Sequence, residues 1–568
     1  MGSAPASATA SITPHSPGPL SAAERGEPAA RVHDRNGAVG TRPTGVTHWA
    51  VLLGLLTIAS RIPFRSRYLF SWDSANFALA LDQYNVTFHQ PQPPGYPLYV
   101  AAAWLVRQVL RDANASYVTL SVLASGLAVA FTVLAAARLY GRVTAVLAGV
   151  MLATSSVFWS QGEVAYPYAF LAGFSALVAW LCLEVRRLTP AVARPQALVV
   201  GIGGLLGFAA GFRSELLPFL APLWTIAALA RPGAWRAKIA ALMVGGATAL
   251  VVVALWYVPM IQLSGGWATY QAATESYYAY FIQTTSGAGK LLLGLLENTR
   301  ALVGFLYNGL GLALLPMVYY LGRYFAPARL VTDWRARFLS VWLAPPLAFY
   351  VTVHIGNPGY VLSLLPALCI YAAEATLGML EDARQAAQLV AERLARPREW
   401  LRRLAAGGWP VPAAIVAVLA IGATNVALFR AANGEGRYPE IRQIDRIFER
   451  QLAFVRRELP AQSTLLIAYD RSRQYHYYLP EYRIELLFNV AVAGAVTDTS
   501  RYWERRTTLT VLPGMNAIVF PDLERNTSDQ PGLVQRVDLG EGVDLFLARV
   551  QVGDEARYGY QYASVVRR

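Results

Sequence analysis

The sequence contains little charge for its length. Only 15% of its 568 residues are Asp, Glu, Lys or Arg, and 55% are hydrophobic, whereas soluble proteins carry about 25% charged residues. This shortage excludes the soluble multidomain protein that the length alone would suggest. Apolar runs of about 20 residues, the length that crosses a hydrocarbon core about 30 Å thick, recur from residue 48 to residue 429. They predict a polytopic α-helical membrane domain.

Cysteine is also scarce. Cys182 and Cys369 both lie inside apolar runs, so the sequence contains neither a disulfide framework nor a CxxC metal site. We find no Walker motif, GxSxG elbow or HExxH motif in the sequence. The sequence therefore contains no motif of a P-loop nucleotide-binding protein, an α/β-hydrolase or a zinc protease.

The positive charge indicates orientation in a membrane and not nucleic-acid binding. The net charge is +14, but many of the arginines lie in short loops between apolar runs, where they favour the cytoplasmic side. Residues 1–46, rich in Ala, Ser, Pro, Gly and Arg, predict a disordered cytoplasmic tail. The run at 48–62 starts too late for a signal peptide and lacks a cleavage site, so we expect it to be a retained first span.

Eleven apolar segments are predicted to span the membrane. They are 48–62, 117–137, 143–159, 164–183, 197–212, 216–230, 239–263, 301–321, 338–354, 360–380 and 411–429. A twelfth segment, 96–110, has about 15 residues and contains Pro97 and Arg107, so we interpret it as interfacial or re-entrant.

The distribution of basic residues supports eleven spans. The loops assigned to the inside hold Arg138, Arg142, Arg186, Arg187, Arg194, Arg231, Arg236, Lys238, Arg323, Arg329, Arg335, Arg337, Arg384, Arg393, Arg396, Arg398, Arg402 and Arg403. The short outer connections after residues 159, 212 and 354 hold only Arg213, as the positive-inside rule expects. A spanning segment at 96–110 would invert every later loop.

We therefore divide the chain into the tail, a membrane domain over 47–430 and an extracytoplasmic domain over 431–568. In the last, 438–459 has helical spacing, and 464–468, 483–488, 517–521 and 543–550 have the pattern of short strands. This combination predicts a small α/β domain.

Two acidic residues are candidates for catalysis. Asp73 follows the first span in an aromatic, apolar setting, where desolvation makes a carboxylate more basic, as a general base requires. The alternative is that Asp73 caps a helix over 74–81. Glu163 lies between two spans on the same predicted side, so the two carboxylates would share one site; the alternative is contact with a helix N-terminus.

Basic and aromatic residues supply candidate binding groups on this side. Arg213 could grip a lipid-linked phosphate, or it could pair with Glu215 or reach the headgroups. The loop over 264–300 contains Lys290 and Arg300 and an aromatic run, which also fits an interface belt. His89 and His354 could belong to one pocket, although a structural role is the common one for a lone histidine and the pattern for a metal site is weak.

Taken together, these segments resemble the GT-C superfamily of polytopic glycosyltransferases, nearest to its protein O-mannosyltransferase-like branch and related bacterial transferases. The likeness covers about 49–380 and is carried by Asp73, the stretch 89–99, which is similar to a His-Pro-Pro-Gly-Tyr-Pro-Leu-Tyr element, and the stretches 159–168, 211–218 and 359–366. The chain departs from the family in the Gln90-Pro-Gln insertion and in the missing acid beside Asp73. These departures weaken a role for His89 and leave a divalent metal open.

The resemblance implies an inverting glycosyltransferase that uses a polyprenyl-phosphate sugar, with mannose one candidate. It implies that Asp73 deprotonates the acceptor hydroxyl and that Glu163 is the second acid. The substrate site would then include His89, Tyr96, Gln161, Tyr166, Arg213, Lys290, Arg300, His354 and Tyr360. No nucleotide site is required, and a divalent metal stays open as a cofactor. Membrane lipids and a protein, glycan or lipid acceptor are the expected partners, in a bacterial inner membrane.

Two other classes remain open at this stage. A transporter or flippase of lipid-linked sugars would also need many spans and a basic vestibule, but it commonly carries inverted repeats and charges at mid-membrane. A non-catalytic scaffold that presents the C-terminal domain is the third. Turnover of a polyprenyl-phosphate sugar would separate the enzyme from both.

Overall fold

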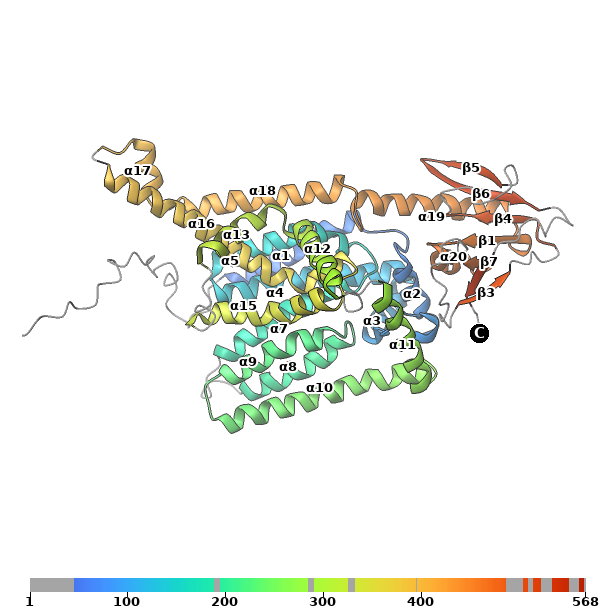
Figure 1. The fold of residues 1–568 in the computed structure, drawn as a ribbon, viewed down its shortest axis with the longest axis horizontal. Coiled ribbons are helices and arrows are strands. Elements are labelled where there is room, and N and C mark those ends of the chain that lie inside the picture. Colours follow the sequence, from blue (N-terminus) through green and yellow to red (C-terminus); the bar gives the residue numbers. More distant parts are fainter. Residues whose placement is uncertain are drawn as a thin grey trace, which may run out of the picture. The chain divides into compact units, whose positions relative to one another are not determined.

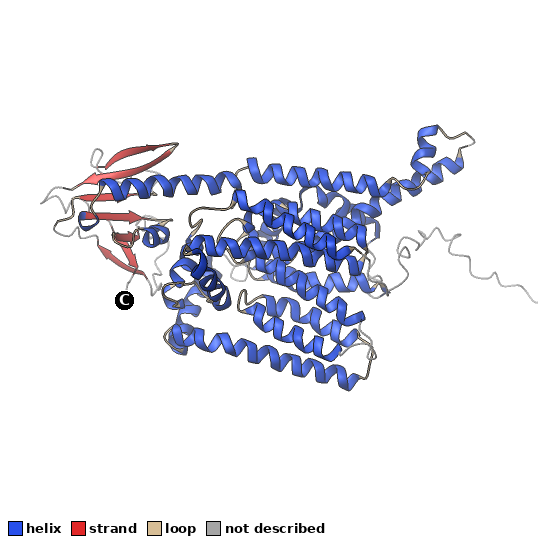
Figure 2. Cartoon of the chain, turned by 180° about the vertical axis from the view of Figure 1, so that it is seen from behind, coloured by secondary structure: helices blue, strands red, loops and turns tan. Residues whose placement is uncertain are grey.

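A computed structural model describes residues 45–187, 195–284, 291–324, 332–394, 396–486, 504–508, 514–522, 534–550 and 561–565. Residues 1–44 of the predicted tail fall outside this part. The described chain is a bundle of helices followed by a smaller sheet (Figures 1 and 2).

The described elements in the first three quarters of the chain are helices. Their bounds are α1 (Val46–Arg61), η2 (Ile62–Phe64), α2 (Trp72–Ala80), η3 (Val86–Phe88), α3 (Pro97–Leu110), α4 (Ala113–Leu139), α5 (Arg142–Thr154), α6 (Ser156–Gly162), α7 (Tyr168–Arg187), α8 (Pro195–Ala210), α9 (Leu216–Ala230), α10 (Trp235–Leu263), α11 (Trp267–Thr284), α12 (Leu291–Leu310), η5 (Gly311–Ala313), α13 (Leu314–Tyr324), α15 (Trp334–Thr352), η6 (Pro358–Ser363), α16 (Leu365–Arg393), α17 (Glu399–Ala405) and α18 (Pro410–Ala431). Each predicted apolar run overlaps one helix or two or three consecutive helices.

The helices confirm a multi-pass architecture but not the count of eleven. Six described helices are long and apolar enough to cross a membrane: Val46–Phe64, α4, α7, α10, Leu292–Tyr324 and α18. The pair α5 and α6, bent by 59°, makes a seventh if it forms one broken span. Helices α8 and α9 are apolar but shorter than a full span, and α15 and α16, which overlap the predicted spans 338–354 and 360–380, are also not among these six. Since each of these two pairs is consecutive in the chain, leaving out a pair preserves the orientation of all later helices.

Helix α3 occupies the segment on which the predicted orientation depends. Its 14 residues give a length of about 21 Å at 1.5 Å per residue, well short of the hydrocarbon core. Its outer surface exposes Trp104, Leu105 and Val109, while Arg107 pairs with Asp82 at 2.7 Å. A short helix with an exposed apolar face and a polar ion pair agrees with an interfacial position.

Small residues allow the helix backbones to approach one another. A Cβ built on Gly203 of α8 would lie 2.3 Å from the carbonyl oxygen of Gly245 on α10. A Cβ built on Gly54 of α1 would lie 3.0 Å from the carbonyl oxygen of Gly126 on α4. Close contacts between small residues are the usual way in which helices pack in membranes.

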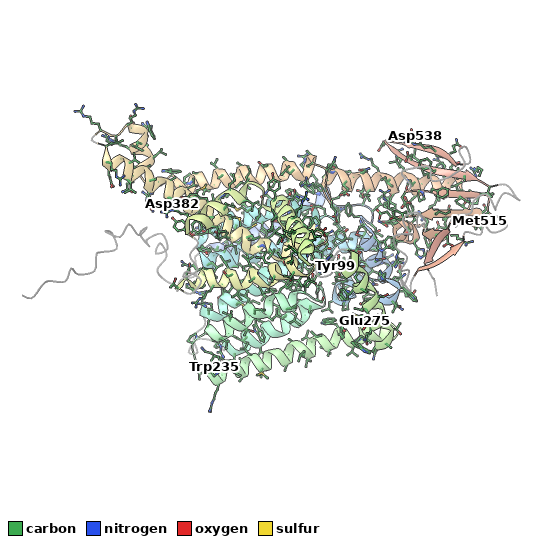
Figure 3. The ribbon with its side chains drawn as sticks, in the orientation of Figure 1. Tyr99, Trp235, Glu275, Asp382, Met515 and Asp538 are labelled. Carbon is green, nitrogen blue, oxygen red and sulfur yellow. The ribbon has the colours of Figure 1, made fainter. Side chains whose placement is uncertain are left out.

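The bundle has two distinct ends. Trp235, at the start of α10, and Asp382, in α16, lie toward one end, and Tyr99 and Glu275 lie toward the other (Figure 3). The described residues at the start of α10, at the end of α16 and in α17, which belong to loops predicted inside, therefore lie away from α2, α3 and α11 (Figure 1).

The C-terminal region, residues 438–565, forms the α/β part. Helix α19 (Tyr438–Glu458) precedes β1 (Thr464–Ala468), α20 (Ser472–Tyr478), β2 (Arg483–Leu486), β3 (Glu504–Thr508), β4 (Ala517–Phe520), β5 (Val534–Gly540), β6 (Val543–Arg549) and β7 (Gln561–Val565). The described strands form one sheet in the order β3-β7-β2-β1-β4-β6-β5, in which β1 is parallel to β2 and β4 and the other pairs are antiparallel. The predicted helix and four strands are confirmed; α20, β3, β5 and β7 were not predicted.

Candidate active site

Asp73 lies in the first turn of α2, but it does not cap that helix. The cap is Ser71, whose hydroxyl accepts a hydrogen bond from the Ser74 amide at 3.2 Å. The helix begins at Trp72, so the capping alternative considered for Asp73 is wrong. An acidic residue in a first turn still interacts favourably with the helix dipole.

The Asp73 carboxylate is partly buried and accepts no hydrogen bond from any described residue. Burial raises the pKa of Asp73 from 3.8 to about 6, and the positive charge of Arg213 opposes the rise. A carboxylate with free oxygens and a pKa close to neutrality is suited to accept a proton.

Arg213, in the turn between α8 and α9, is enclosed by one carboxylate and three aromatic rings. Its Nε donates to Glu215 Oε1 at 2.7 Å, and its Nη2 donates to the same oxygen. The guanidinium carbon lies 4.8 Å from the ring centre of Tyr168, 5.2 Å from Tyr360 and 5.5 Å from Tyr96. The pairing with Glu215 that the sequence allowed is confirmed. Buried and held in this way, the charge of Arg213 has a fixed position beside Asp73.

The tyrosines around Arg213 come from distant parts of the chain. Tyr96 precedes α3, Tyr168 begins α7 and Tyr360 lies in η6. Tyr166 and Tyr277 also interact electrostatically with Asp73. Tyr96, Tyr166, Arg213 and Tyr360 of the predicted set therefore gather around Asp73.

Glu163 is not part of this group. It is fully buried behind α6, and its Oε1 lies 3.9 Å from Nε of Arg61, a buried residue at the end of α1. Neither carboxylate oxygen has a hydrogen-bond partner within the described residues, including any helix amide. Arg61 in turn donates to the Ala153 carbonyl and lies 4.2 Å from the ring centre of Trp159. This is a buried ion pair between helices, without the contact to a helix N-terminus that was the alternative.

The remaining candidates surround the site at different distances. Gln161 is fully buried in α6, and its amide atoms have no hydrogen-bond partner in the described part of the chain. His89 packs edge-on against Tyr277 at 5.4 Å, and His354 packs edge-on against Tyr360 at 5.8 Å. The histidines therefore contact two aromatic residues of the Asp73 group.

Two predicted cations are not brought to Asp73. Arg300 is exposed on α12 and does not appear among the charges that act on Asp73. Lys290 lies outside the described residues. Among the residues that the structure describes, no group of three or more His, Cys, Asp or Glu side chains has the geometry to hold a metal ion.

The structure adds Tyr168, Tyr277, Arg61 and Glu435 to the residues predicted to matter. Glu435 precedes α19, receives a hydrogen bond from Asn357 and interacts electrostatically with Asp73. Burial raises the pKa of Glu435 to about 6. Tyr168 ends the stretch 159–168 and Tyr277 belongs to the aromatic run in 264–300, so both lie in segments that the sequence pointed to. No sequence pattern indicated Glu435, which follows Asp73 by 362 positions.

Comparison with known proteins gives one family and several related folds. Residues 73–235 match the model of the protein O-mannosyl-transferase TMEM260 N-terminal domain. No curated protein sequence matches the chain.

Solved structures similar to this chain include ArnT from Cupriavidus metallidurans bound to undecaprenyl phosphate, with 15% identity over 90% of this chain and 99% of that chain and a TM-score of 0.49. AglB from Archaeoglobus fulgidus, in complex with an inhibitory peptide and a dolichol-phosphate, has 11% identity over 84% of this chain and 69% of that chain and a TM-score of 0.46. The family match covers Asp73, Glu163 and Arg213. Residues 73–235 are therefore similar to the N-terminal domain of the protein O-mannosyl-transferase TMEM260 family, in agreement with the predicted likeness to the protein O-mannosyltransferase-like branch.

Proposed function

We propose that the chain is an inverting glycosyltransferase that moves a sugar from a polyprenyl-phosphate donor to an acceptor hydroxyl at the outer face of the membrane. The observation that carries the proposal is the Asp73 carboxylate, which has no hydrogen bond from a described residue and lies beside the enclosed charge of Arg213. A bacterial inner membrane is the proposed location, with 47–430 as the catalytic domain and 431–568 outside.

Asp73 acts as the general base in this proposal. The acceptor oxygen forms a bond to the anomeric carbon, the bond from that carbon to the phosphate oxygen breaks, and the electron pair leaves with the lipid phosphate. The acceptor proton passes to Asp73. A pKa of about 6 leaves the carboxylate ionised at neutral pH while keeping it more basic than an exposed aspartate.

Arg213 stabilises the departing phosphate. Its bonds to Glu215 use the Nε and Nη2 groups, and the Nη1 group is not used in them. A guanidinium that is already positioned and shielded from water stabilises developing negative charge without reorganisation. The hydroxyl groups of Tyr96, Tyr168 and Tyr360 are further donors beside it.

The family match supports mannose as the sugar and a protein hydroxyl as the acceptor to test first. The experiment incubates the purified full chain with radiolabelled polyprenyl-phosphate mannose, or glucose for comparison, and measures transfer to hydroxyl-bearing peptides and release by water. Asp73→Asn should lower the transfer rate roughly 10²- to 10⁴-fold. Its expression level should equal that of the wild type, and its unfolding temperature should be the same or higher.

The matched control is Asp82→Asn. Asp82 follows the same helix, α2, and forms an exposed ion pair with Arg107 in the wild type. This variant should transfer sugar at the wild-type rate. A folded Asp73→Asn protein with wild-type turnover would exclude Asp73 as the base.

A flippase is the second candidate, favoured by the 59° break between α5 and α6, because transporters commonly use discontinuous helices. Vesicles containing the chain and a fluorescent polyprenyl-phosphate sugar test it. Movement of the lipid between leaflets without sugar transfer would favour the flippase.

A further inference from the structure

The loops on both sides of α2 are held by the C-terminal region. Before α2, the amides of Arg67 and Tyr68 donate to Asp445 of α19 at 2.9 and 3.0 Å, and the Leu69 amide donates to the hydroxyl of Tyr478 in α20 at 2.8 Å. Helix α20 packs directly against α2 (Figure 1). A region about 370 to 410 positions later in the sequence thus fixes the approach to Asp73.

After α2, the contact is made by one buried arginine of α20. Arg473 is only 1% exposed. Its Nη2 donates to the carbonyl oxygens of Phe88 and, at 3.3 Å, His89. Its guanidinium carbon lies 5.9 Å from the ring centre of Trp72, within the range of a cation–π contact.

The turn that Arg473 holds has a constrained backbone. Asn85 and Gln90 exchange two backbone hydrogen bonds, at 2.6 and 3.0 Å, across the turn. His89 has a φ of 53°, in the left-handed region that a residue with a side chain rarely adopts. Two carbonyls that point to one buried guanidinium favour this conformation, and the His89 ring then meets Tyr277 of the Asp73 group.

We propose that Arg473 is a positioning residue, through which the C-terminal region holds the 85–90 turn and Trp72 and so fixes Asp73 for the reaction. Arg473 does not touch the reacting atoms; it acts through the residue that precedes Asp73 and through His89. The kinetic part of this inference rests on the proposed transferase function, whereas the structural part does not.

The test compares Arg473→Gln, Arg473→Lys and the control Arg450→Gln in the full chain. Arg450 belongs to α19 of the same region and forms a partly exposed ion pair with Glu541, so its loss should leave α2 unaffected. Hydrogen–deuterium exchange of a peptide covering residues 84–91 is measured by mass spectrometry. The rate of sugar transfer is measured at saturating and at limiting concentrations of the donor.

Arg473→Gln should exchange faster in the 84–91 peptide, while peptides from β1 and from α4 exchange as in the wild type. Its kcat should fall roughly tenfold to a hundredfold, as expected when a catalytic group is displaced by about 1 Å, while the donor KM changes less than kcat. Arg473→Lys should recover part of the rate, because an ammonium donates to both carbonyls but does not match the planar contact with Trp72.

Unchanged exchange in Arg473→Gln, or faster exchange with wild-type kcat, would overturn the proposal. Faster exchange throughout the C-terminal region would also overturn it, since Arg473 would then stabilise that region and not the turn. If the wild-type chain transfers no sugar, the proposed function fails, and the 84–91 peptide still decides whether Arg473 holds the turn.

Discussion

Asp73 and Glu163 have opposite surroundings, although the sequence presents them as a pair. Asp73 is partly exposed, accepts no hydrogen bond from the described residues, and interacts with an arginine that already has its own carboxylate, Glu215. Glu163 is completely buried and has Arg61 as its charge partner. Of these two carboxylates, Asp73 is the one that reaches the protein surface.

The difference lies in what each carboxylate neutralises. Glu163 offsets the charge of Arg61, which is buried where two helices end, and a buried charge left without a partner is strongly destabilising. Asp73 is not needed to neutralise the charge of Arg213, because Arg213 is already paired with Glu215. We infer that Glu163 supports the fold and Asp73 the chemistry, and the following variants test that distinction.

The largest expected effect is on stability. Glu163→Gln leaves the Arg61 charge buried without a carboxylate and should lower the free energy of unfolding by about 3–5 kcal/mol. The double variant Arg61→Met with Glu163→Leu should recover most of this loss, because apolar residues replace both charges. Unfolding in detergent, followed by helical circular dichroism, measures both.

The control for this prediction is Glu399→Gln, which breaks the exposed pair with Arg403 and should change stability by less than about 1 kcal/mol. Sugar transfer per folded molecule should remain close to wild type in Glu163→Gln. A Glu163→Gln protein that is as stable as the wild type but inactive would instead show that Glu163 takes part in catalysis. The proposed difference in role between Glu163 and Asp73 would then be wrong.

The next effect is on rate and its pH dependence. Arg213→Gln removes stabilisation of the leaving phosphate and should lower kcat/KM roughly 10²- to 10³-fold. In the wild type, kcat/KM should rise with pH through about 6, the pKa of Asp73, because the base must be ionised. Arg213 lowers that pKa, so this acidic limb should move to higher pH in Arg213→Gln.

A pH series of transfer rates for the wild type, Arg213→Gln and the control Arg107→Gln measures these shifts. Arg107 pairs with the exposed Asp82 and should show the wild-type profile. If the acidic limb of the pH profile does not move in Arg213→Gln, the group that titrates in this limb is not Asp73.

The smallest effect is a gain in stability from Asp73→Asn. The folded pKa of Asp73 is raised from 3.8 to about 6, so ionisation opposes folding above pH 6 and has no effect on stability below about pH 4. Asparagine does not ionise. We expect Asp73→Asn to be more stable than the wild type by up to about 3 kcal/mol at pH 8, with the gap closing at pH 4.

Thermal unfolding of both proteins at the two pH values measures this gap. A lower unfolding temperature for Asp73→Asn at pH 8 would show that the carboxylate stabilises the fold, as Glu163 does.

The fold could be predicted in part because its main signals are local. The predicted apolar runs coincide with most long helices of the bundle, because side chains that face lipid must be apolar one after another. Helix α11 is an exception, since it lies in the segment 264–300 that was predicted as a loop. The strand patterns at 464–468 and 517–521 held because the sheet centre is buried on both faces. The predicted number of spans was not confirmed, because α5 and α6 bend at Ser155, α8 and α9 are short, and α15 and α16 are not among the described helices that are long and apolar enough to cross a membrane.

The site was predicted less completely. Asp73, Tyr96, Arg213 and Tyr360 were singled out and lie together, whereas Glu163 was assigned to the same place and pairs with Arg61 instead. The contacts of Arg473 with Phe88 and of Glu435 with Asn357 join residues 385 and 78 positions apart. Pairings at such separations leave no pattern in a single sequence.

The sequence by itself determined that this chain is a helical membrane protein, which segments are apolar, and which residue types are available near the ends of those segments. These properties follow from the free energy of transferring each side chain between water and lipid, which depends on the residue type. Only the tertiary structure decided which charge meets which. Whether a carboxylate is a base or half of a buried ion pair depends on its desolvation and on its nearest opposite charge, and both are set by packing between helices that are far apart in the chain.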